Sequence, residues 1–166
     1  MLVPLFLSPG TLAPHVVLTR RRADLRRHAG EISFPGGRQD PDDVDLKDTA
    51  LREAEEEIGL PRSVVSLIGE LTPTSTFATN YVIHPFVGLL PAGQIWRASP
   101  REVDAVLELP LEALRRARTR TRMERRGFTF YTDAYIFEDH MIWGATARIL
   151  EDLLEHESSL LQPPGP

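Results

Sequence analysis

The sequence predicts an α+β fold, in which a few helices pack against a mixed β-sheet. Strand-like segments come mostly in runs, and helix-like segments interrupt them at long intervals, which is not the pattern of a regular doubly wound fold. The chain has 166 residues, and a chain of that length buries roughly 70% of its unfolded surface without cross-links. We therefore expect a single domain over residues 1–166, with a frayed tail at 162–166.

The first half of the chain predicts two strands and a helix. Residues 1–7 are apolar and broken by Pro4, which favours an N-terminal strand or packing arm, and residues 16–18 form a short buried strand. Asp48 is a good N-cap for a helix over 49–58, which ends at Gly59 because glycine readily takes the left-handed conformation of a helix C-terminus. Before this helix, the run Phe34-Pro35-Gly36-Gly37 indicates a tight turn or a close backbone approach.

The second half alternates between strand and helix patterns. The expected strands are residues 64–71, 81–90 with an interruption at Pro85, 103–109 and 128–137. The expected helices are residues 111–118, opened by Pro110, and 144–155, with Ala147, Leu150, Leu153 and Leu154 on one side.

Composition excludes several classes of function. The 24 acidic residues outnumber the 19 basic ones, so the net charge of −5 argues against a general nucleic-acid or membrane-surface binder. Without cysteine, the chain has no disulfide, thiolate metal site or cysteine nucleophile. No segment reaches the roughly 18 apolar residues that span a membrane. The apolar start also lacks the basic flank of a signal peptide, so we expect a cytoplasmic protein.

Three glutamates share one face of the helix predicted over 49–58. Glu53, Glu56 and Glu57 fall within about one hundred degrees of arc, so their carboxylates can converge, while Arg52 reaches Glu56 one turn later. An acidic run on a helix is usually a solvated face. Here, however, a glycine turn precedes the carboxylates. This combination is typical of a binding site for a pyrophosphate held through a hard divalent cation.

Residues 37–60 resemble the Nudix box, the signature of hydrolases acting on nucleoside diphosphates linked to another moiety. The run Arg52-Glu53-Ala54-Glu55-Glu56-Glu57-Ile58-Gly59-Leu60 fits the second half at every defined position. In the first half, Gly37 lies fifteen residues before Arg52 where the pattern has fourteen, and Asp43 replaces the isolated Glu. One inserted residue in the acidic loop would explain both departures.

The resemblance implies a catalytic hydrolase with a Nudix-type α/β/α sandwich. It also implies that Glu53, Glu56 and Glu57 bind Mg²⁺ or Mn²⁺, and that Arg52 orients a carboxylate through a salt bridge. A further carboxylate serves as general base in this family, and Glu102 is our first candidate, with Asp104 second. Glu102 is equally compatible with a surface position at a strand start. We assign no role to His28 or His84.

A second motif, over about residues 18–37, resembles the upstream signature of the coenzyme A pyrophosphatase branch. The matching residues are Leu18-Thr19-Arg20-Arg21, Arg26, Gly30 and Phe34-Pro35-Gly36-Gly37. Arg22 stands where that branch has Ser or Ala, and Ile142-Trp143-Gly144-Ala145-Thr146-Ala147 is similar to the branch downstream. The resemblance, which runs over about 16–154, implies hydrolysis of coenzyme A to 3′,5′-ADP and 4′-phosphopantetheine. It makes Arg20, Arg21, Arg26, Gly36 and Gly37 the expected substrate contacts.

The arginines suit such a substrate, because coenzyme A carries a 3′-phosphate that planar guanidinium groups recognise. The alternative is that they form a solvated face or pair with the acidic loop at 40–48. A second basic run, Arg115 to Arg126, holds seven arginines in twelve residues and is the one local feature favouring an RNA partner. We interpret it mainly as a solvated helix end and loop that could lend a cation to the substrate tail.

Two other functions stay open. One is a Nudix pyrophosphatase of another nucleoside diphosphate, such as NADH or ADP-ribose. The other is a non-catalytic Nudix-fold binding module, for which lost box carboxylates would be expected, whereas all are present here. We expect a small-molecule substrate and no nucleic-acid or membrane partner, and the sequence leaves homodimer formation open.

Overall fold

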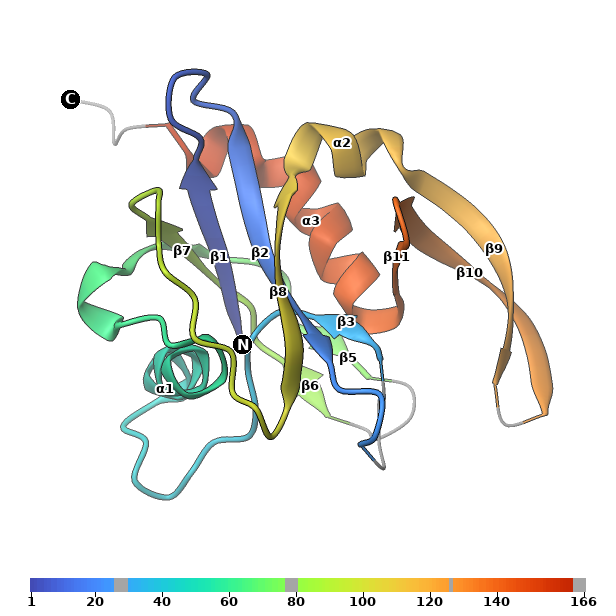
Figure 1. Ribbon diagram of the computed structural model, residues 1–166, viewed down its shortest axis with the longest axis horizontal. Helices are drawn as coiled ribbons and strands as arrows, with labels where there is room; N and C mark the ends of the chain where they lie inside the picture. Colours follow the sequence, from blue (N-terminus) through green and yellow to red (C-terminus); the bar gives the residue numbers. More distant parts are fainter. Residues whose placement is uncertain (26–29, 77–80, 126, 163–166) are drawn as a thin grey trace.

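A mixed sheet of six strands forms the centre of the computed structural model, which describes residues 1–25, 30–76, 81–125 and 127–162 (Figure 1). The strand order is β3-β2-β1-β7-β4, and β8 pairs with β2. The strands are β1 (Leu2–Leu7), β2 (Pro14–Arg21), β3 (Ile32–Ser33), β4 (Ser66–Glu70), β7 (Phe86–Leu90) and β8 (Val103–Pro110). β1 and β7 are parallel and the other pairs antiparallel, so the predicted mixed sheet is confirmed.

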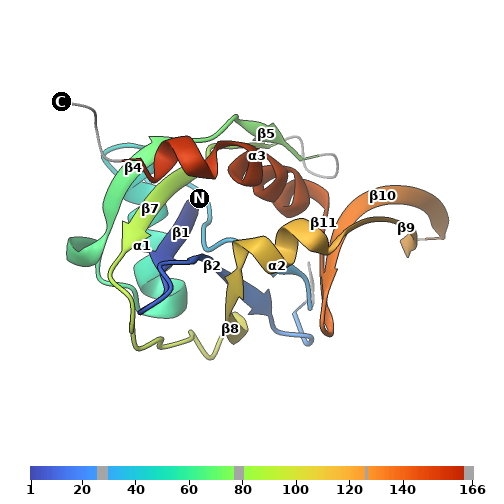
Figure 2. The ribbon, with the colours of Figure 1, turned by 90° about the horizontal axis from the view of Figure 1, so that it is seen from above.

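Helices cover both faces of this sheet. They are α1 (Leu46–Ile58), the 3₁₀ turn η1 (Arg62–Val64), α2 (Leu111–Arg116) and α3 (Gly144–Leu160). Val17 of β2 packs in one cluster with Ala54 and Ile58 of α1, whereas Val16 and Leu18 pack with α3. Because successive side chains of a strand point to opposite faces, α1 and α3 lie on opposite sides of the sheet (Figure 2). The expected α/β/α sandwich is therefore confirmed.

A second sheet projects from the body of the molecule. It consists of β9 (Arg118–Arg125), β10 (Phe128–Phe137) and β11 (His140–Trp143), and the β9–β10 hairpin extends beyond α3 (Figure 1). The prediction that residues 118–125 form a helix end and loop is therefore wrong, because they pair in register with β10. A small third sheet joins β5 (Thr74–Ser75) and β6 (Val82–Ile83).

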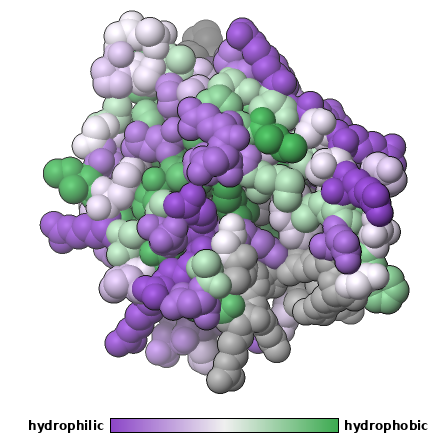
Figure 3. Space-filling view, turned by 45° about the vertical axis from the view of Figure 1, so that its right-hand side comes forward, coloured by the Kyte–Doolittle hydropathy of each residue, from purple (hydrophilic) through white to green (hydrophobic). Residues whose placement is uncertain are grey.

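The surface around this hairpin is mixed in character. Figure 3 brings that side of the molecule forward and shows mostly hydrophilic side chains, with hydrophobic groups in small, separate patches. Phe128, for example, is 74% exposed. None of the helices among the described residues is long and apolar enough to cross a membrane.

Helix α1 begins three residues earlier than predicted, because its N-cap is Asp45 and not Asp48. The Asp45 carboxylate accepts hydrogen bonds from the backbone N–H groups of Lys47 and Asp48, both at 2.8 Å. These are two of the four amides that a helix start leaves without partners. The predicted end at Gly59 is confirmed, since Gly59 has φ 69° and donates to Ala54 and Glu55.

The remaining boundaries shift by a few residues. The predicted strand over 81–90 is divided at Pro85 into β6 and β7, as expected, and α3 continues to Leu160 instead of ending at 155. The helix expected over 111–118 ends at Arg116, with Pro110 as its N-cap. In the tail expected to fray, residues 163–166 lie outside the described residues.

Candidate active site

The loop before β8 fixes the C-terminal end of α1. The backbone N–H of Ser99 donates to the carbonyl of Glu57 at 2.8 Å, and that of Arg97 donates to Ile58 at 2.9 Å. Carbonyls at a helix end have no partner within the helix, so these bonds anchor α1 to the loop. A Cβ on Gly59 would lie 2.8 Å from the Cβ of Arg97, so glycine permits this close approach. No sequence pattern indicated this contact.

Glu57 lies in the interior beneath the glycine turn. Its residue exposure is 6%, and its Oε2 accepts a hydrogen bond of 3.2 Å from the backbone N–H of Gly36. The pKa of Glu57 is raised to about 7, mainly by burial and also by the charges of Glu53 and Glu102, while the Gly36 hydrogen bond opposes the rise. The N-terminal ammonium of Met1 is a positive neighbour, because the charges of Glu53 and Glu57 raise its pKa against the larger effect of burial.

Glu53 occupies the space next to the same turn. A Cβ added to Gly37 would overlap the Glu53 carboxylate, so glycine is what allows the two to lie in contact. Burial raises the pKa of Glu53; Arg52 opposes this shift, and the charges of Glu56 and Glu102 add to it. The turn at Gly36 and Gly37 therefore lies directly against two acidic side chains of α1.

Arg52 ties the acidic loop to the helix. Its Nε and Nη2 donate to the two carboxylate oxygens of Asp43 at 2.8 and 2.9 Å, and its Nη1 donates to Glu53 at 3.1 Å. Nη1 also reaches both oxygens of Glu56, each at 3.3 Å. The hydrogen bonds from Arg52 hold the pKa of Asp43 well below its usual range. Both carboxylate oxygens of Asp43 are thus engaged by Arg52.

The donor set fits a hard divalent cation. The raised pKa values of Glu53 and Glu57 mark buried negative charge that a cation would stabilise, and carboxylate oxygens are the ligands that such cations prefer. Glu56 is more open, with a side chain 59% exposed, and is turned towards Arg52. Within the described ranges, Glu53, Glu56 and Glu57 do not bring three ligand atoms within 4.8 Å of one another, whereas two groups elsewhere do. They are Glu138-Asp139-His140 and Asp152-Glu155-His156.

Arg21 and Glu102 lie beside the buried carboxylates. Nη1 of Arg21 is 3.8 Å from Oε2 of Glu102, and the Arg21 charge lowers the pKa of Glu57 against the larger effect of burial. The Nε of Arg21 is buried and has no hydrogen-bond partner. The Glu102 side chain is 51% exposed, so it combines proximity to Glu57 with access to water.

Arg20 points elsewhere, although it is adjacent to Arg21 on β2. Its guanidinium donates to Asp104 at 2.9 Å and lies 4.0 Å from Asp139. Asp104, the second candidate base, is therefore engaged with Arg20. The structure brings Arg21, but not Arg20, to the α1 carboxylates, and Arg26 lies outside the described residues.

A sequence model of the NUDIX domain family matches residues 3–131 of this chain. The chain belongs to the Nudix family. Proteins named uncharacterized Nudix hydrolase NudL, from Yersinia pestis (strain Pestoides F) and Yersinia pseudotuberculosis (serotype O:1b), are each 41% identical over 160 residues, which is 95% of this chain and 78% of theirs. The protein is accordingly a Nudix hydrolase, an enzyme acting on pyrophosphate bonds.

Solved structures support the Nudix fold. The Nudix hydrolase RenU of M. smegmatis aligns with a TM-score of 0.68 at 14% identity, covering 99% of this chain and 87% of its own. The Ap4A hydrolase of C. elegans, solved as a binary complex, aligns with a TM-score of 0.55 at 20% identity, covering 67% and 78%. Nudix enzymes bind small nucleotide substrates, and the family uses divalent metal ions.

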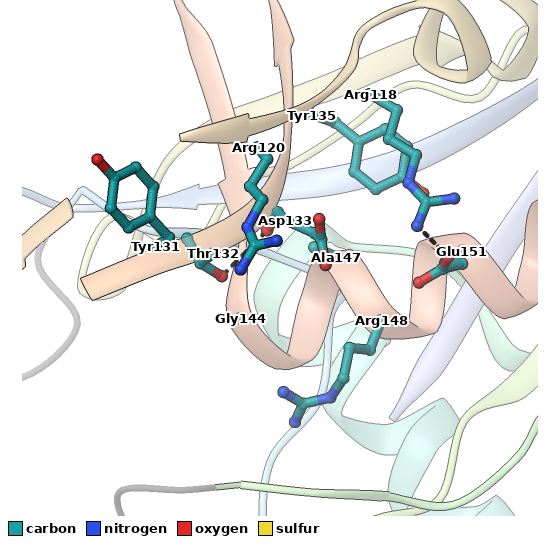
Figure 4. A pocket seen from close by; sticks show the side chains of 10 residues that line it. All are labelled: Arg118, Arg120, Tyr131, Thr132, Asp133, Tyr135, Gly144, Ala147, Arg148 and Glu151. Carbon is teal, nitrogen blue, oxygen red and sulfur yellow. Dashed lines mark hydrogen bonds and ion pairs between the residues drawn. The ribbon is translucent and has the colours of Figure 1, made fainter. Parts of the chain in front are cut away.

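Two cavities lie away from the Nudix helix α1. One, of about 250 Å³, is enclosed between the β9–β10 hairpin and α3 (Figure 4). It holds the ion pair of Arg118 with Glu151, and Arg120 and Tyr131 from the hairpin. The other, of about 440 Å³, lies between Arg20 and β11. Neither includes a residue of the Nudix helix.

Proposed function

We propose that this Nudix hydrolase cleaves the pyrophosphate bond of coenzyme A to give 3′,5′-ADP and 4′-phosphopantetheine. The observation that carries the proposal is the place of Arg21. It comes from the segment resembling the coenzyme A branch, lies 3.8 Å from Glu102, acts through its charge on the pKa of Glu57, and has a buried Nε without a partner. Buried donors are nearly always paired, so a phosphate oxygen of the substrate is a fitting acceptor, and guanidinium–phosphate bonds are among the strongest in proteins.

In this proposal, some residues of the Nudix box bind the metal ion and the others hold those ligands in position. Mg²⁺ or Mn²⁺ bound by Glu53, Glu56 and Glu57 would neutralise pyrophosphate charge and activate water. Arg52, itself fixed by Asp43, holds Glu53 and Glu56 in place. The Gly36 N–H orients the Glu57 carboxylate, and the turn without side chains at Gly36 and Gly37 lets the diphosphate approach the backbone.

Glu102 is our proposed general base. Its exposed carboxylate lies near Glu57 and close to Arg21. It would accept the proton of the attacking water as the new P–O bond forms. The bond from phosphorus to the bridging oxygen then breaks, and the second phosphate leaves with that oxygen. Asp104 is less suited to this role because it is paired with Arg20.

The runner-up function is hydrolysis of another nucleoside diphosphate, such as NADH or ADP-ribose. The state of Arg20 favours it, because this arginine of the coenzyme A motif already pairs with Asp104 and lies near Asp139. Structural neighbours include an Ap4A hydrolase and a NUDIX domain complexed with ADP ribose. A non-catalytic binding module is disfavoured because the box carboxylates are all present.

Product analysis decides between these substrates. The purified enzyme with Mg²⁺ is given coenzyme A, dephospho-coenzyme A, NADH, ADP-ribose and a diadenosine polyphosphate in parallel, and kcat/KM is measured for each. We expect coenzyme A to have the highest value. Arg21→Gln should narrow the preference for coenzyme A over its dephospho form, while Arg22→Gln, at an exposed residue paired with Asp24, should not. If coenzyme A is cleaved no faster than ADP-ribose, the assignment fails.

A further inference from the structure

The cavity of about 440 Å³ has a lining unlike that of a phosphate site. Ile32 of β3, Met123 of β9 and Met141 of β11 contribute apolar surface, together with Trp143. Met123 and Met141 are two of the three methionines in the whole chain. Methionine is flexible and polarisable, and it is common where a surface accommodates ligands of varying shape.

The charges around the cavity also disfavour an anion. Its described lining includes one arginine, Arg20, against the carboxylates of Glu31, Glu124 and Asp139. Arg20 is itself engaged with Asp104 and lies near Asp139. A phosphate group entering here would meet more negative than positive charge, so the cavity suits an uncharged ligand.

One polar atom in the lining lacks a partner. Nδ1 of His140 is buried and makes no hydrogen bond, although an oxygen of Asp139 lies 3.5 Å away. The side chain is 11% exposed. A buried polar atom without a partner is costly, and an amide group of a ligand could supply the missing bond.

The cavity and the α1 carboxylates lie at the two ends of one short segment. Ile32 lines the cavity, and the chain runs from it through Phe34 to Gly36, which bonds Glu57. Four residues span at most about 13 Å, at about 3.3 Å each, and the bend at Pro35 shortens this path. On the neighbouring β2, Arg20 lines the cavity on the α3 side of the sheet and Arg21 points to the α1 side, where its charge acts on Glu57, so the two places are joined around the ends of β2 and β3. A ligand with a diphosphate at one end and a long arm could therefore reach both places.

We infer that this cavity receives the neutral, amide-bearing arm of the substrate, on the far side of the diphosphate from the nucleoside. The inference rests on the proposed function, since coenzyme A and its thioesters carry such an arm and ADP-ribose does not. The apolar side chains pack along the arm, His140 bonds one of its amides, and the methionines adapt to different acyl groups at its end. The substrate class is thus coenzyme A together with its acyl thioesters.

The test measures recognition of the two halves of the substrate separately. The variant Met123→Ala/Met141→Ala is compared with wild type and with Ile95→Ala, a control at a residue 84% exposed and outside this cavity. We measure kcat/KM for coenzyme A, acetyl-coenzyme A and ADP-ribose, and inhibition by each product alone. The cavity variant should lose about ten-fold in kcat/KM for both coenzyme A substrates, as expected for lost apolar contacts in a substrate pocket. Its inhibition by 4′-phosphopantetheine should weaken equally.

The controls are within the same protein. Hydrolysis of ADP-ribose and inhibition by 3′,5′-ADP should stay unchanged in the cavity variant, which shows that it is folded. Either single methionine variant replaces the double one if the latter does not fold. Equal losses for coenzyme A and ADP-ribose, or an unchanged response to 4′-phosphopantetheine, would overturn the cavity assignment alone. A wild-type enzyme that does not favour coenzyme A would overturn the proposed function and the cavity assignment together.

Discussion

Glu57 combines burial with a single backbone hydrogen bond, from Gly36. Because its position suits a metal ligand, Glu57→Gln should lower kcat/KM by about a hundred-fold or more, a loss on the scale of removing one key electrostatic group from an active site. Glu55→Gln is the matched control, since Glu55 is an exposed residue of the same helix that pairs with Arg62. Steady-state kinetics on both variants measure the difference, and an active Glu57→Gln enzyme would contradict the ligand assignment.

The same carboxyl should make the metal-free protein sensitive to pH. Burial raises the pKa of Glu57 from 4.5 to about 7, so between these values the folded state binds more protons than the unfolded state. The contribution of Glu57 to the free energy of unfolding therefore falls as pH rises through this window, by at most about 3 kcal/mol. The N-terminal ammonium of Met1, whose pKa burial lowers from 8.0 to about 6, contributes in the opposite direction between these two values. Denaturant unfolding in the presence of a metal chelator, at pH 5 and at pH 8, measures this change in the free energy of unfolding.

Glu57→Gln isolates this contribution. The variant should lose part of the pH dependence and, without metal, should be more stable than wild type at pH 8. Adding Mg²⁺ should stabilise wild type more than the variant. Identical pH profiles for the two proteins would mean that Glu57 does not titrate in this range.

Gly37 offers a substitution that separates activity from stability. A Cβ there would overlap the far end of the Glu53 side chain, which can move aside. Gly37→Ala should therefore displace Glu53 and lower Mg²⁺ affinity or activity by about ten- to a hundred-fold, the usual effect of disturbing the support of a metal ligand. Its melting temperature should change little. Gly93→Ala, at φ 79° in open space, should show the reverse: lower stability and unchanged activity.

At the residue scale, the sequence predicted which side chains gather on α1 but not all of their partners. The spacing of Glu53, Glu56 and Glu57 sufficed to place them on one helix face, because helical periodicity is local. The divergence of Arg20 and Arg21 depends on the pairing of β2 and on an irregularity in register between them. Such long-range pairing leaves no mark in the spacing of the residues themselves.

At the element scale, the start of α1 rests on Asp45. Asp45→Ala should lower the free energy of unfolding by about 1 kcal/mol, the typical effect of losing an N-cap, whereas Asp45→Asn should be nearly neutral because Asn caps equally well. Denaturant unfolding of the two variants measures the difference. Equal stability of Asp45→Ala and Asp45→Asn would show that the cap contributes nothing.

Elements with a strong internal pattern were predictable. The strand at 128–137 alternates and was predicted with its observed bounds, and the apolar side of α3 was predicted although its last turn was not. β9 escaped prediction because its alternating arginines and threonines carry no apolar face, and its strand conformation depends on pairing with β10. β3 and β5 have two residues each, too few for any periodicity.

At the scale of the whole molecule, two apolar clusters lie on opposite faces of one sheet. Ile58 belongs to the α1 cluster and Ile149 to the α3 cluster, and both are almost fully buried. Ile58→Val and Ile149→Val should each lower the free energy of unfolding by about 1 kcal/mol. Because the two sites share no contacts, the double variant should equal the sum within about 0.5 kcal/mol.

This experiment also addresses the prediction of one domain. All variants should unfold in a single transition, with coincident fluorescence and circular-dichroism curves. Two transitions, each sensitive to one substitution, would mean that the clusters unfold independently.

The divergence of Arg20 and Arg21 has a consequence for how specificity can change. In a strand, inserting or deleting one residue exchanges the faces of every side chain beyond it. A single-codon deletion between Pro14 and Arg20 would therefore move Arg21 to the face of Arg20 and Arg22 to the face of Arg21, so that an arginine still points towards the carboxylates of α1. Because of this run of three arginines, the charge on each face of β2 is changed by substitution and not by a one-residue change in strand length.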